Sequence, residues 1–204
     1  MSESRDRLTM EKKYVLVFDF CSSTSIIDQL ILEGHLEGWR NLLIDIKRFL
    51  QEERVAHVFD VYKFTGDGWI LLFDEDFSPS NLFSFVDRLC DKYAVAYDKR
   101  IKKVLSTHID KIGITFGLHY GDVIRFVMLG VREYIGRPLN IATRLQTSIK
   151  DNDPEPQGKI LMSKLVYSKI KHYIPRTYKL WKVTRELKNV VGGSNYDAIK
   201  CEKR

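Results

Sequence analysis

The sequence lacks the features that mark membrane-spanning, secreted and disulfide-rich proteins. No apolar stretch in its 204 residues approaches the roughly 20 that a membrane-spanning helix needs. Residues 1–13 are charged and contain no apolar core of a secretory signal. The cysteines, Cys21, Cys90 and Cys201, are widely spaced and odd in number, which excludes a disulfide framework and a zinc motif. We therefore predict a soluble, reduced protein of the cytoplasm with no membrane partner.

The charged residues are of mixed sign and form no block. The chain has 33 Lys and Arg against 27 Asp and Glu, a net charge of +6. Its basic residues are dispersed and match no recognised nucleic-acid-binding motif, so we expect no nucleic-acid partner. With 44% hydrophobic residues, the chain can bury a substantial core. Its length suits one domain, which we place at 14–204 after a polar lead-in at 1–13.

Hydrophobic periodicity divides the chain into short strands and amphipathic helices. A buried strand is predicted at 14–20, followed by a helix whose apolar stripe runs from Leu36 to Leu50. The further predicted elements are strands at 55–65 and 69–74, a helix opening at Ser78, strands at 111–120 and 123–129, a helix at 138–146, a strand at 160–162, a helix at 163–171, and strands at 178–187 and 196–200. This order predicts one α+β domain with a mostly antiparallel sheet flanked by helices.

Asp19 interrupts an otherwise apolar strand, where an unpaired buried carboxylate is costly. It either meets a cation or lies at the open end of the strand. The residues after it, Phe20 to Thr24, have the chemistry of a turn before a helix, which directs backbone N–H groups toward an anion. A carboxylate beside such a turn is what magnesium–nucleotide binding requires. The alternative is an Asp that only caps the next segment.

Asp67 lies between two glycines in the turn of a predicted hairpin. An Asp in this position usually serves the turn alone. Pairing of the hairpin with the first strand would bring Asp67 near Asp19, however. Two carboxylates with open positions for water and phosphate oxygens suit Mg²⁺, and two such ions can hold the attacking and leaving oxygens of a phosphoryl transfer.

Asn140 and Arg144 are four residues apart on a predicted helix and therefore share one of its faces. An amide and a guanidinium in this arrangement form a donor pair for a phosphate group at its transition state. Polar pairs at this spacing are also common on ordinary solvated surfaces. We therefore interpret the pair as functional only in combination with the two carboxylates.

Four segments, in this order, resemble the motifs of the class III nucleotidyl cyclases, the adenylate and guanylate cyclase catalytic domain. They are VFDFCSST at 17–24, KFTGDG at 63–68, ITFGLHYG at 114–121 and EYIGRPLNIATR at 133–144. The resemblance runs over nearly the whole chain, from about residue 14 to residue 200. It implies the ferredoxin-like fold of these cyclases.

The resemblance also implies a reaction and the residues that perform it. Asp19, Phe20 and Asp67 are the expected ligands of two Mg²⁺ or Mn²⁺ ions per active site. Asn140 is expected to orient the ribose and Arg144 to stabilise the transition state, both from the second subunit of a homodimer. The 3′-hydroxyl of a nucleoside triphosphate then attacks the α-phosphorus and expels pyrophosphate.

The triphosphate-binding residues implied by the resemblance lie in two places. Ser22, Ser23, Thr24 and the backbone amides around them form the first. Lys188, near the predicted C-terminal hairpin, is the nearest match to a basic residue that often contacts the phosphates in this family.

The residues expected to select the base depart from the family's usual sets. Adenylate cyclases pair a Lys with an Asp or Thr at the positions of Lys63 and Glu133, and guanylate cyclases use Glu and Cys. Glu133 would narrow a purine pocket, or it forms a plain salt bridge with Lys63. Tyr62 is adjacent, and a one-residue shift in register would place it in the pocket instead, where its bulk would favour a smaller base. The first motif, DFCSST at 19–24, and the second, TGDGWILLF at 65–73, are also unusual. Both motifs resemble those of the pyrimidine cyclases of bacterial Pycsar anti-phage systems.

The prediction is therefore a cyclase that makes cyclic UMP or cyclic CMP, which a separate effector then binds. Within the same enzyme class the alternative is a freestanding adenylate cyclase. From another class, the alternative is an inactive binding module of the same fold. The presence of Asp19, Asp67, Asn140 and Arg144 together argues against an inactive module. Because the cyclase core takes up nearly all of the chain, we expect sensor and effector functions to lie in other polypeptides.

Overall fold

The computed structural model describes residues 8–203, with the side chains of residues 56 and 57 excepted. Its strands are β1 (Thr9–Phe20), β2 (Phe59–Phe64), β3 (Gly68–Asp74), β4 (Ile114–Met128), β5 (Val131–Ile135), β6 (Lys159–Ser163), β7 (Tyr178–Arg185) and β8 (Tyr196–Lys203). Its helices are α1 (Ser23–Leu32), α2 (Leu36–His57), α3 (Ser80–Arg100), α4 (Arg137–Asn152) and α5 (Lys164–Ile170). The protein is thus α+β, as the sequence predicts.

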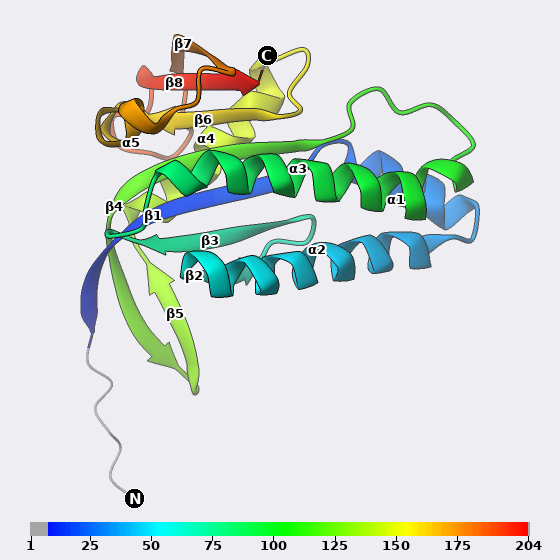
Figure 1. Ribbon diagram of the computed structural model, residues 1–204, viewed down its shortest axis with the longest axis horizontal. Coiled ribbons are helices and arrows are strands. Elements are labelled where there is room, and N and C mark those ends of the chain that lie inside the picture. The colour runs from blue at the N-terminus through cyan, green and yellow to red at the C-terminus, as the bar shows by residue number, and fades with distance from the viewer. Residues whose placement is uncertain (1–7, 204) are drawn as a thin grey trace, which may run out of the picture.

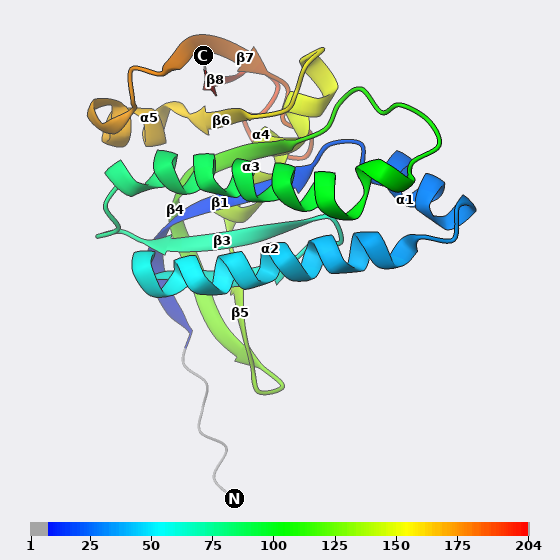
Figure 2. The same cartoon turned by 45° about the vertical axis from the view of Figure 1, so that its right-hand side comes forward.

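One mixed sheet organises the described residues. Its strand order is β2-β3-β1-β4-β6-β8-β7, and β5 pairs with β4 beside this path. The pairing of β4 with β6 is parallel, and every other pairing described is antiparallel. The β4–β5 hairpin extends away from the body of the sheet (Figures 1 and 2). The prediction of a mostly antiparallel sheet flanked by helices is confirmed.

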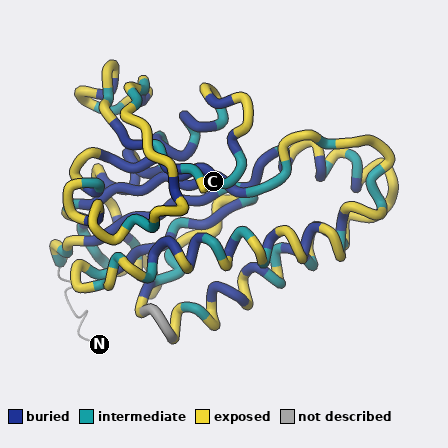
Figure 3. The backbone as a smooth tube through the Cα atoms, turned by 45° about the horizontal axis from the view of Figure 1, so that its top comes forward, coloured by how far each residue is buried: buried dark blue, intermediate teal, exposed yellow. Residues whose placement is uncertain are grey.

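The alternation of side chains along β1 separates the two faces of the sheet. Leu16, Phe18 and Phe20 pack in the large core beneath α2 and α3. Val15 and Val17 face the other way, into a smaller core that α4 covers. Figure 1 shows α2 and α3 across one face, and Figure 3 shows buried and exposed positions alternating along these long helices. Asp19 continues the Val15–Val17 series and therefore points to the face of α4.

The first strand is longer than its apolar run. β1 begins at Thr9, so the end of the expected polar lead-in is strand, and residues 1–7 lie outside the described part of the chain. Thr9 to Lys13 pair with Gly121 to Arg125 of β4. Their alternating polar side chains are typical of a half-exposed ribbon, which a search for hydrophobic runs misses.

Two predicted boundaries were wrong. Residues 55–57 belong to α2, which ends at His57 before Val58 in the left-handed conformation. The expected hairpin at Gly121 is instead one continuous strand, β4. The chain turns only at Leu129 and Gly130, both at positive φ, which is the backbone that a tight hairpin requires. Gly121 serves packing, because a Cβ there would lie 2.9 Å from Cγ of Pro138.

Candidate active site

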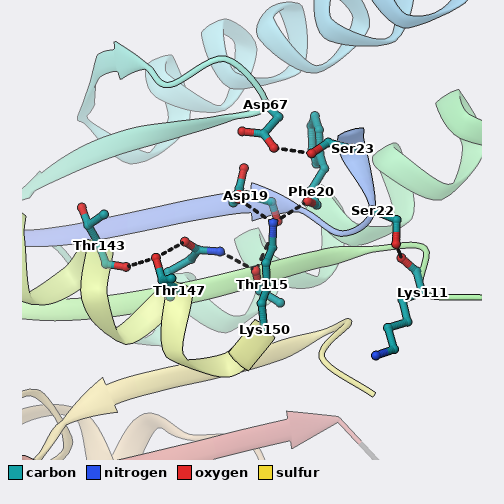
Figure 4. Close-up of polar contacts among 11 residues, drawn as sticks. Asp19, Phe20, Ser22, Ser23, Asp67, Lys111, Thr115, Thr143, Thr147 and Lys150 are labelled. Carbon is teal, nitrogen blue, oxygen red and sulfur yellow. Dashed lines mark hydrogen bonds and ion pairs between the residues drawn. The ribbon is translucent and has the colours of Figure 1, made fainter. Parts of the chain in front are cut away.

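Two carboxylates meet where β1 ends and β3 begins. Asp19 pairs with Gly68 across the strands, and the backbone N–H of Phe20 donates to the carbonyl oxygen of Asp67 at 3.1 Å. A Cβ on Gly68 would lie 2.0 Å from the carbonyl oxygen of Phe18. Only glycine therefore allows the β2–β3 turn to come this close to β1. The expected approach of Asp67 to Asp19 is confirmed (Figure 4).

The carboxylate of Asp19 is largely enclosed and incompletely partnered. The Lys150 ammonium donates to its Oδ2 atom at 2.6 Å, whereas Oδ1 is buried and has no hydrogen-bond partner among residues 8–203. Burial, followed by the neighbouring Asp67, raises the pKa of Asp19 to about 7, and Lys150 acts in the opposite direction. This carboxylate therefore has unused capacity for a cation.

The turn after β1 leads directly into α1. Ser22 adopts the left-handed conformation at φ 57°, and its hydroxyl donates to the carbonyl oxygen of Lys111 at 3.0 Å. The Ser23 hydroxyl donates to Oδ2 of Asp67 (Figure 4). Thr24 is exposed on the first turn of α1. The serines thus link the start of the helix to the carboxylates.

The expected anion-binding turn is shorter than predicted. The N–H of Phe20 is taken by Asp67, and the N–H of Cys21 donates to the carbonyl oxygen of Gly113 at 2.9 Å. These two amides hold the turn in place and are not available to a ligand. Anion binding by the backbone therefore narrows to the first turn of α1, from Ser22 onward.

Helix α4 is held unusually close to the sheet on the Asp19 face. A Cβ on Gly117 of β4 would lie 2.0 Å from the carbonyl oxygen of Ala142, so the helix backbone rests on the strand itself. Nε2 of Gln146 donates to the Thr115 hydroxyl at 2.8 Å, and that hydroxyl lies 3.4 Å from the backbone oxygen of Asp19. The helix therefore supports both the backbone and the carboxylate of Asp19.

Asn140 and Arg144 lie on α4, the first exposed and the second half-buried. Lys150 follows Arg144 by six residues on the same helix, which corresponds to roughly 120° around the axis and about 9 Å along it. Since Lys150 reaches Asp19 of its own chain, Arg144 points in a different direction. The sequence-based expectation that Arg144 serves a site in a second subunit is compatible with this geometry.

The three residues expected to select the base come together in one chain. The Tyr62 hydroxyl donates to Oε2 of Glu133 at 2.6 Å and accepts from the N–H of Tyr134 at 3.2 Å. Nζ of Lys63 lies 3.7 Å from the same Oε2 atom. Burial, followed by the bond to Glu133, raises the pKa of Tyr62, which keeps its hydroxyl protonated as a donor.

The lysine near the carboxylates is not the one that the sequence predicted. Lys188 is exposed in the loop between β7 and β8, and the polar contacts of residues 8–203 join it to neither Asp19 nor Asp67. Lys150, which the sequence analysis did not single out, does contact Asp19. A lysine in the last turn of a helix is ordinarily a partner of the helix dipole, so its sequence position carried no signal of this role.

The donor atoms present suit a divalent metal ion. Among residues 8–203, no three His, Cys, Asp or Glu side chains gather as a metal-binding group. Mg²⁺, however, retains several waters and is commonly bound through one or two carboxylates plus substrate phosphates. Asp19, with its orphaned Oδ1 atom, Asp67 and the carbonyl oxygen of Phe20 provide such an incomplete oxygen set.

A large cavity of about 740 Å³ lies elsewhere, between α3 and the segment before β4. Tyr93, Tyr97, Leu105 and Gly113 are among its lining residues, and neither Asp19 nor Asp67 is. The cavity touches the site only indirectly, because Gly113 also accepts the N–H of Cys21. The candidate active site is therefore defined by its polar groups and not by this cavity.

Comparisons with known proteins identify the fold. No family model matches the sequence, and no curated protein matches it. Solved structures do match. The adenylyl cyclase CyaB from P. aeruginosa superposes with a TM-score of 0.73 at 17% identity, covering 97% of each chain. The guanylyl cyclase Cya2 superposes at 0.68 with 14% identity, covering 96% of this chain and 94% of that one.

A third match is the guanylate cyclase domain of RhGC from Catenaria anguillulae in complex with GTP. Its TM-score is 0.59 at 17% identity, over 96% of this chain and 99% of that domain. At these identities the comparisons establish a shared fold. The chain therefore has the fold of nucleotidyl cyclase catalytic domains, as its sequence motifs indicate. None of the helices in residues 8–203 has the length and apolarity to cross a bilayer.

Proposed function

We propose that this protein is a nucleotidyl cyclase that converts a pyrimidine nucleoside triphosphate, UTP or CTP, into the 3′,5′-cyclic nucleotide and pyrophosphate. The observation that carries the proposal is the pair Asp19 and Asp67 beside the first turn of α1, within the fold of the adenylyl and guanylyl cyclases. The pair offers carboxylates for cations, and the helix start offers N–H groups for phosphate oxygens.

The residues of the chain bind and orient the substrate. Asp19, Asp67 and the Phe20 carbonyl would hold Mg²⁺ or Mn²⁺, which when bound neutralises the triphosphate and makes the 3′-hydroxyl more acidic. The backbone N–H groups at Ser22, Ser23 and Thr24, at the start of α1, bind phosphate oxygens. The oxygen of the 3′-hydroxyl forms a bond to the α-phosphorus as its proton is lost to solvent. The bond from that phosphorus to the leaving pyrophosphate breaks.

The active form in this proposal is a homodimer. Asn140 of a second copy positions the ribose, and Arg144 of that copy stabilises the negative charge that grows on the α-phosphate in the transition state. The different directions of Arg144 and Lys150 on α4 support this division of labour. Exposed apolar residues on the β4–β5 hairpin, Met128 and Leu129, offer contact surface to the second copy.

The preference for a pyrimidine rests on Tyr62, Lys63 and Glu133. The tyrosine ring is held by bonds of its hydroxyl to Glu133 and to the Tyr134 backbone, so it does not swing aside for a large base. A fixed ring reduces the room for the second ring of a purine, while Glu133 and Lys63 can bond the polar edge of a pyrimidine. We extend the proposal to a signalling role in anti-phage defence, with the cyclic product bound by a separate effector.

One experiment tests the reaction and its base. The purified protein is incubated with Mn²⁺ and each of ATP, GTP, CTP and UTP, and the products are separated by chromatography and identified by mass. We expect cyclic UMP or cyclic CMP together with pyrophosphate. Cyclisation of ATP or GTP alone would contradict the pyrimidine preference. Absence of any cyclic product would contradict the proposed enzyme.

A further inference from the structure

Lys150 occupies the position of a cation at the candidate metal site. Its ammonium donates to Oδ2 of Asp19 at 2.6 Å and to the carbonyl oxygen of Phe20 at 2.7 Å. These two oxygens belong to the set proposed above to bind a divalent ion. Figure 4 shows the lysine side chain extending from α4 to the end of β1. The ammonium and a metal ion therefore require the same oxygens.

The contact differs from an ordinary surface salt bridge. Lys164 and Asp197 form a pair of equal length, 2.6 Å, but their side chains are 59% and 52% exposed. The side chains of Lys150 and Asp19 are 29% and 20% exposed. Lys150 also bonds a backbone carbonyl at the strand end, as a coordinated cation would. A single positive charge partly compensates two adjacent carboxylates, and within the described part of the chain Oδ1 of Asp19 has no hydrogen-bond partner.

We propose that the Lys150 ammonium is a built-in competitor of the divalent metal at Asp19 and Phe20, an inference that rests on the proposed function. In the resting protein the lysine holds the two oxygens in place. A metal ion must displace it to bind there. Since four methylene groups join the ammonium to the helix, it can withdraw without movement of α4. Metal alone then binds weakly, and the metal–triphosphate complex binds with the added energy of its phosphate contacts.

The test measures binding of Mn²⁺ itself, in the absence of nucleotide. Free Mn²⁺ is followed by its electron paramagnetic resonance signal during titration of the full-length wild type, Lys150→Met and Lys150→Gln. We expect both variants to bind Mn²⁺ about tenfold more tightly or to take up an additional ion, because a like charge has been removed from the site. Lys164→Met, which loses a lysine–aspartate bond of the same length, should behave as wild type.

Thermal unfolding provides a second readout that includes a control for folding. Without metal, Lys150→Met should melt below wild type, because Asp19 and Asp67 lose their compensating cation. Saturating Mn²⁺ should raise its melting temperature by more than that of wild type. Lys150→Arg, which keeps the positive charge, should retain weak Mn²⁺ binding.

The outcomes separate this inference from the proposed function. In one outcome, the neutral variants bind Mn²⁺ with wild-type affinity and number of ions while Asp19→Asn weakens binding. That result would contradict the proposed competition by Lys150 and would support the metal site at Asp19. If Asp19→Asn leaves Mn²⁺ binding unchanged in every background, the metal assignment itself is wrong, and the competition with it.

Discussion

Two aspartates of this protein show how differently a carboxylate can be accommodated. Asp153, at the end of α4, is 5% exposed and is surrounded by cations: Lys200 at 2.6 Å, Arg185 at 3.1 Å and Lys159 at 3.8 Å. Asp19, by contrast, is paired with Lys150 and has a second carboxylate, Asp67, beside it. The first arrangement ties α4 to β6, β7 and β8. The second leaves charge uncompensated.

The difference between the partners of Asp153 and of Asp19 indicates which carboxylate has a functional role. The charge of a buried carboxylate with several cationic partners is fully compensated, and removal of the carboxylate leaves those cations unpaired. A carboxylate with an orphaned oxygen and a like-charged neighbour is poorly placed for stability alone. Its cost is offset when a cationic ligand arrives. The following predictions test this contrast, from the largest expected effect to the smallest.

Asp19→Asn and Asp67→Asn should each lower turnover at least about 100-fold, because the oxygens that would neutralise the triphosphate are lost. Cyclic nucleotide formation under saturating substrate measures the effect. Circular dichroism and gel filtration should remain those of wild type. Substantial turnover in both variants would rule out their metal-binding role.

Asp153→Asn should instead destabilise the protein by about 3 to 5 kcal/mol, since Lys200, Arg185 and Lys159 would be left with no carboxylate among them. Denaturant unfolding measures the free energy. The variant should retain turnover at low temperature, where it is still folded. A stability equal to wild type would show that the three cations are adequately solvated without Asp153.

His119 offers a third buried titratable group, held neutral. Burial, followed by the charge of Arg137, lowers its pKa to about 4. The unfolded chain, with a pKa near the usual ~6.5, therefore binds more protons, and stability falls by up to about 3 kcal/mol as the pH drops from 6.5 to 4.

The pKa of Asp19, raised to about 7, gives a change of opposite sign, because the folded state then holds the extra proton. The histidine contribution is therefore the difference in unfolding free energy between wild type and His119→Gln across this range. That difference should vary with pH. A constant difference would contradict the lowered pKa of His119.

Mixing Asp19→Asn protein with Arg144→Ala protein should restore part of the activity that each variant lacks. In a homodimer with shared sites, random exchange yields mixed dimers in which one site has both residues intact, about a quarter of all sites. Recovery of cyclic nucleotide formation after mixing measures this. Verified subunit exchange without recovery would contradict a site formed by two copies.

Most elements of the fold were predictable because they follow hydrophobic periodicity. The α2 stripe and the buried part of β1 are examples. The predicted ends of the strands were wrong where the residues follow no hydrophobic pattern. Thr9 to Lys13 form strand through pairing with β4, and Gly121 continues β4 because it pairs with Lys13, with Pro138 close beside it. Such pairing and packing depend on segments distant in the sequence.

The candidate site likewise has features that could be predicted from the sequence and features that only the structure shows. The juxtaposition of Asp19 and Asp67 could be predicted, because a glycine-flanked hairpin pairs naturally with a neighbouring strand. The bonds that Tyr62 makes to Glu133 and to the Tyr134 backbone join two distant strands. The backbone N–H groups of Phe20 and Cys21 donate to the carbonyl oxygens of Asp67 and Gly113. No local sequence pattern indicates these two hydrogen bonds.

The sequence by itself determined the class of fold, the pair of carboxylates and the helix that carries Asn140 and Arg144, since these depend on local patterns and short motifs. Only the tertiary structure decided that Lys150 of α4 meets Asp19 and that Asp153 is enclosed by three cations. The reason is physical. The sequence gives the charge of each side chain. Which partner that charge meets depends on how closely the helix and the sheet pack, and here on the close contact of Gly117 with α4.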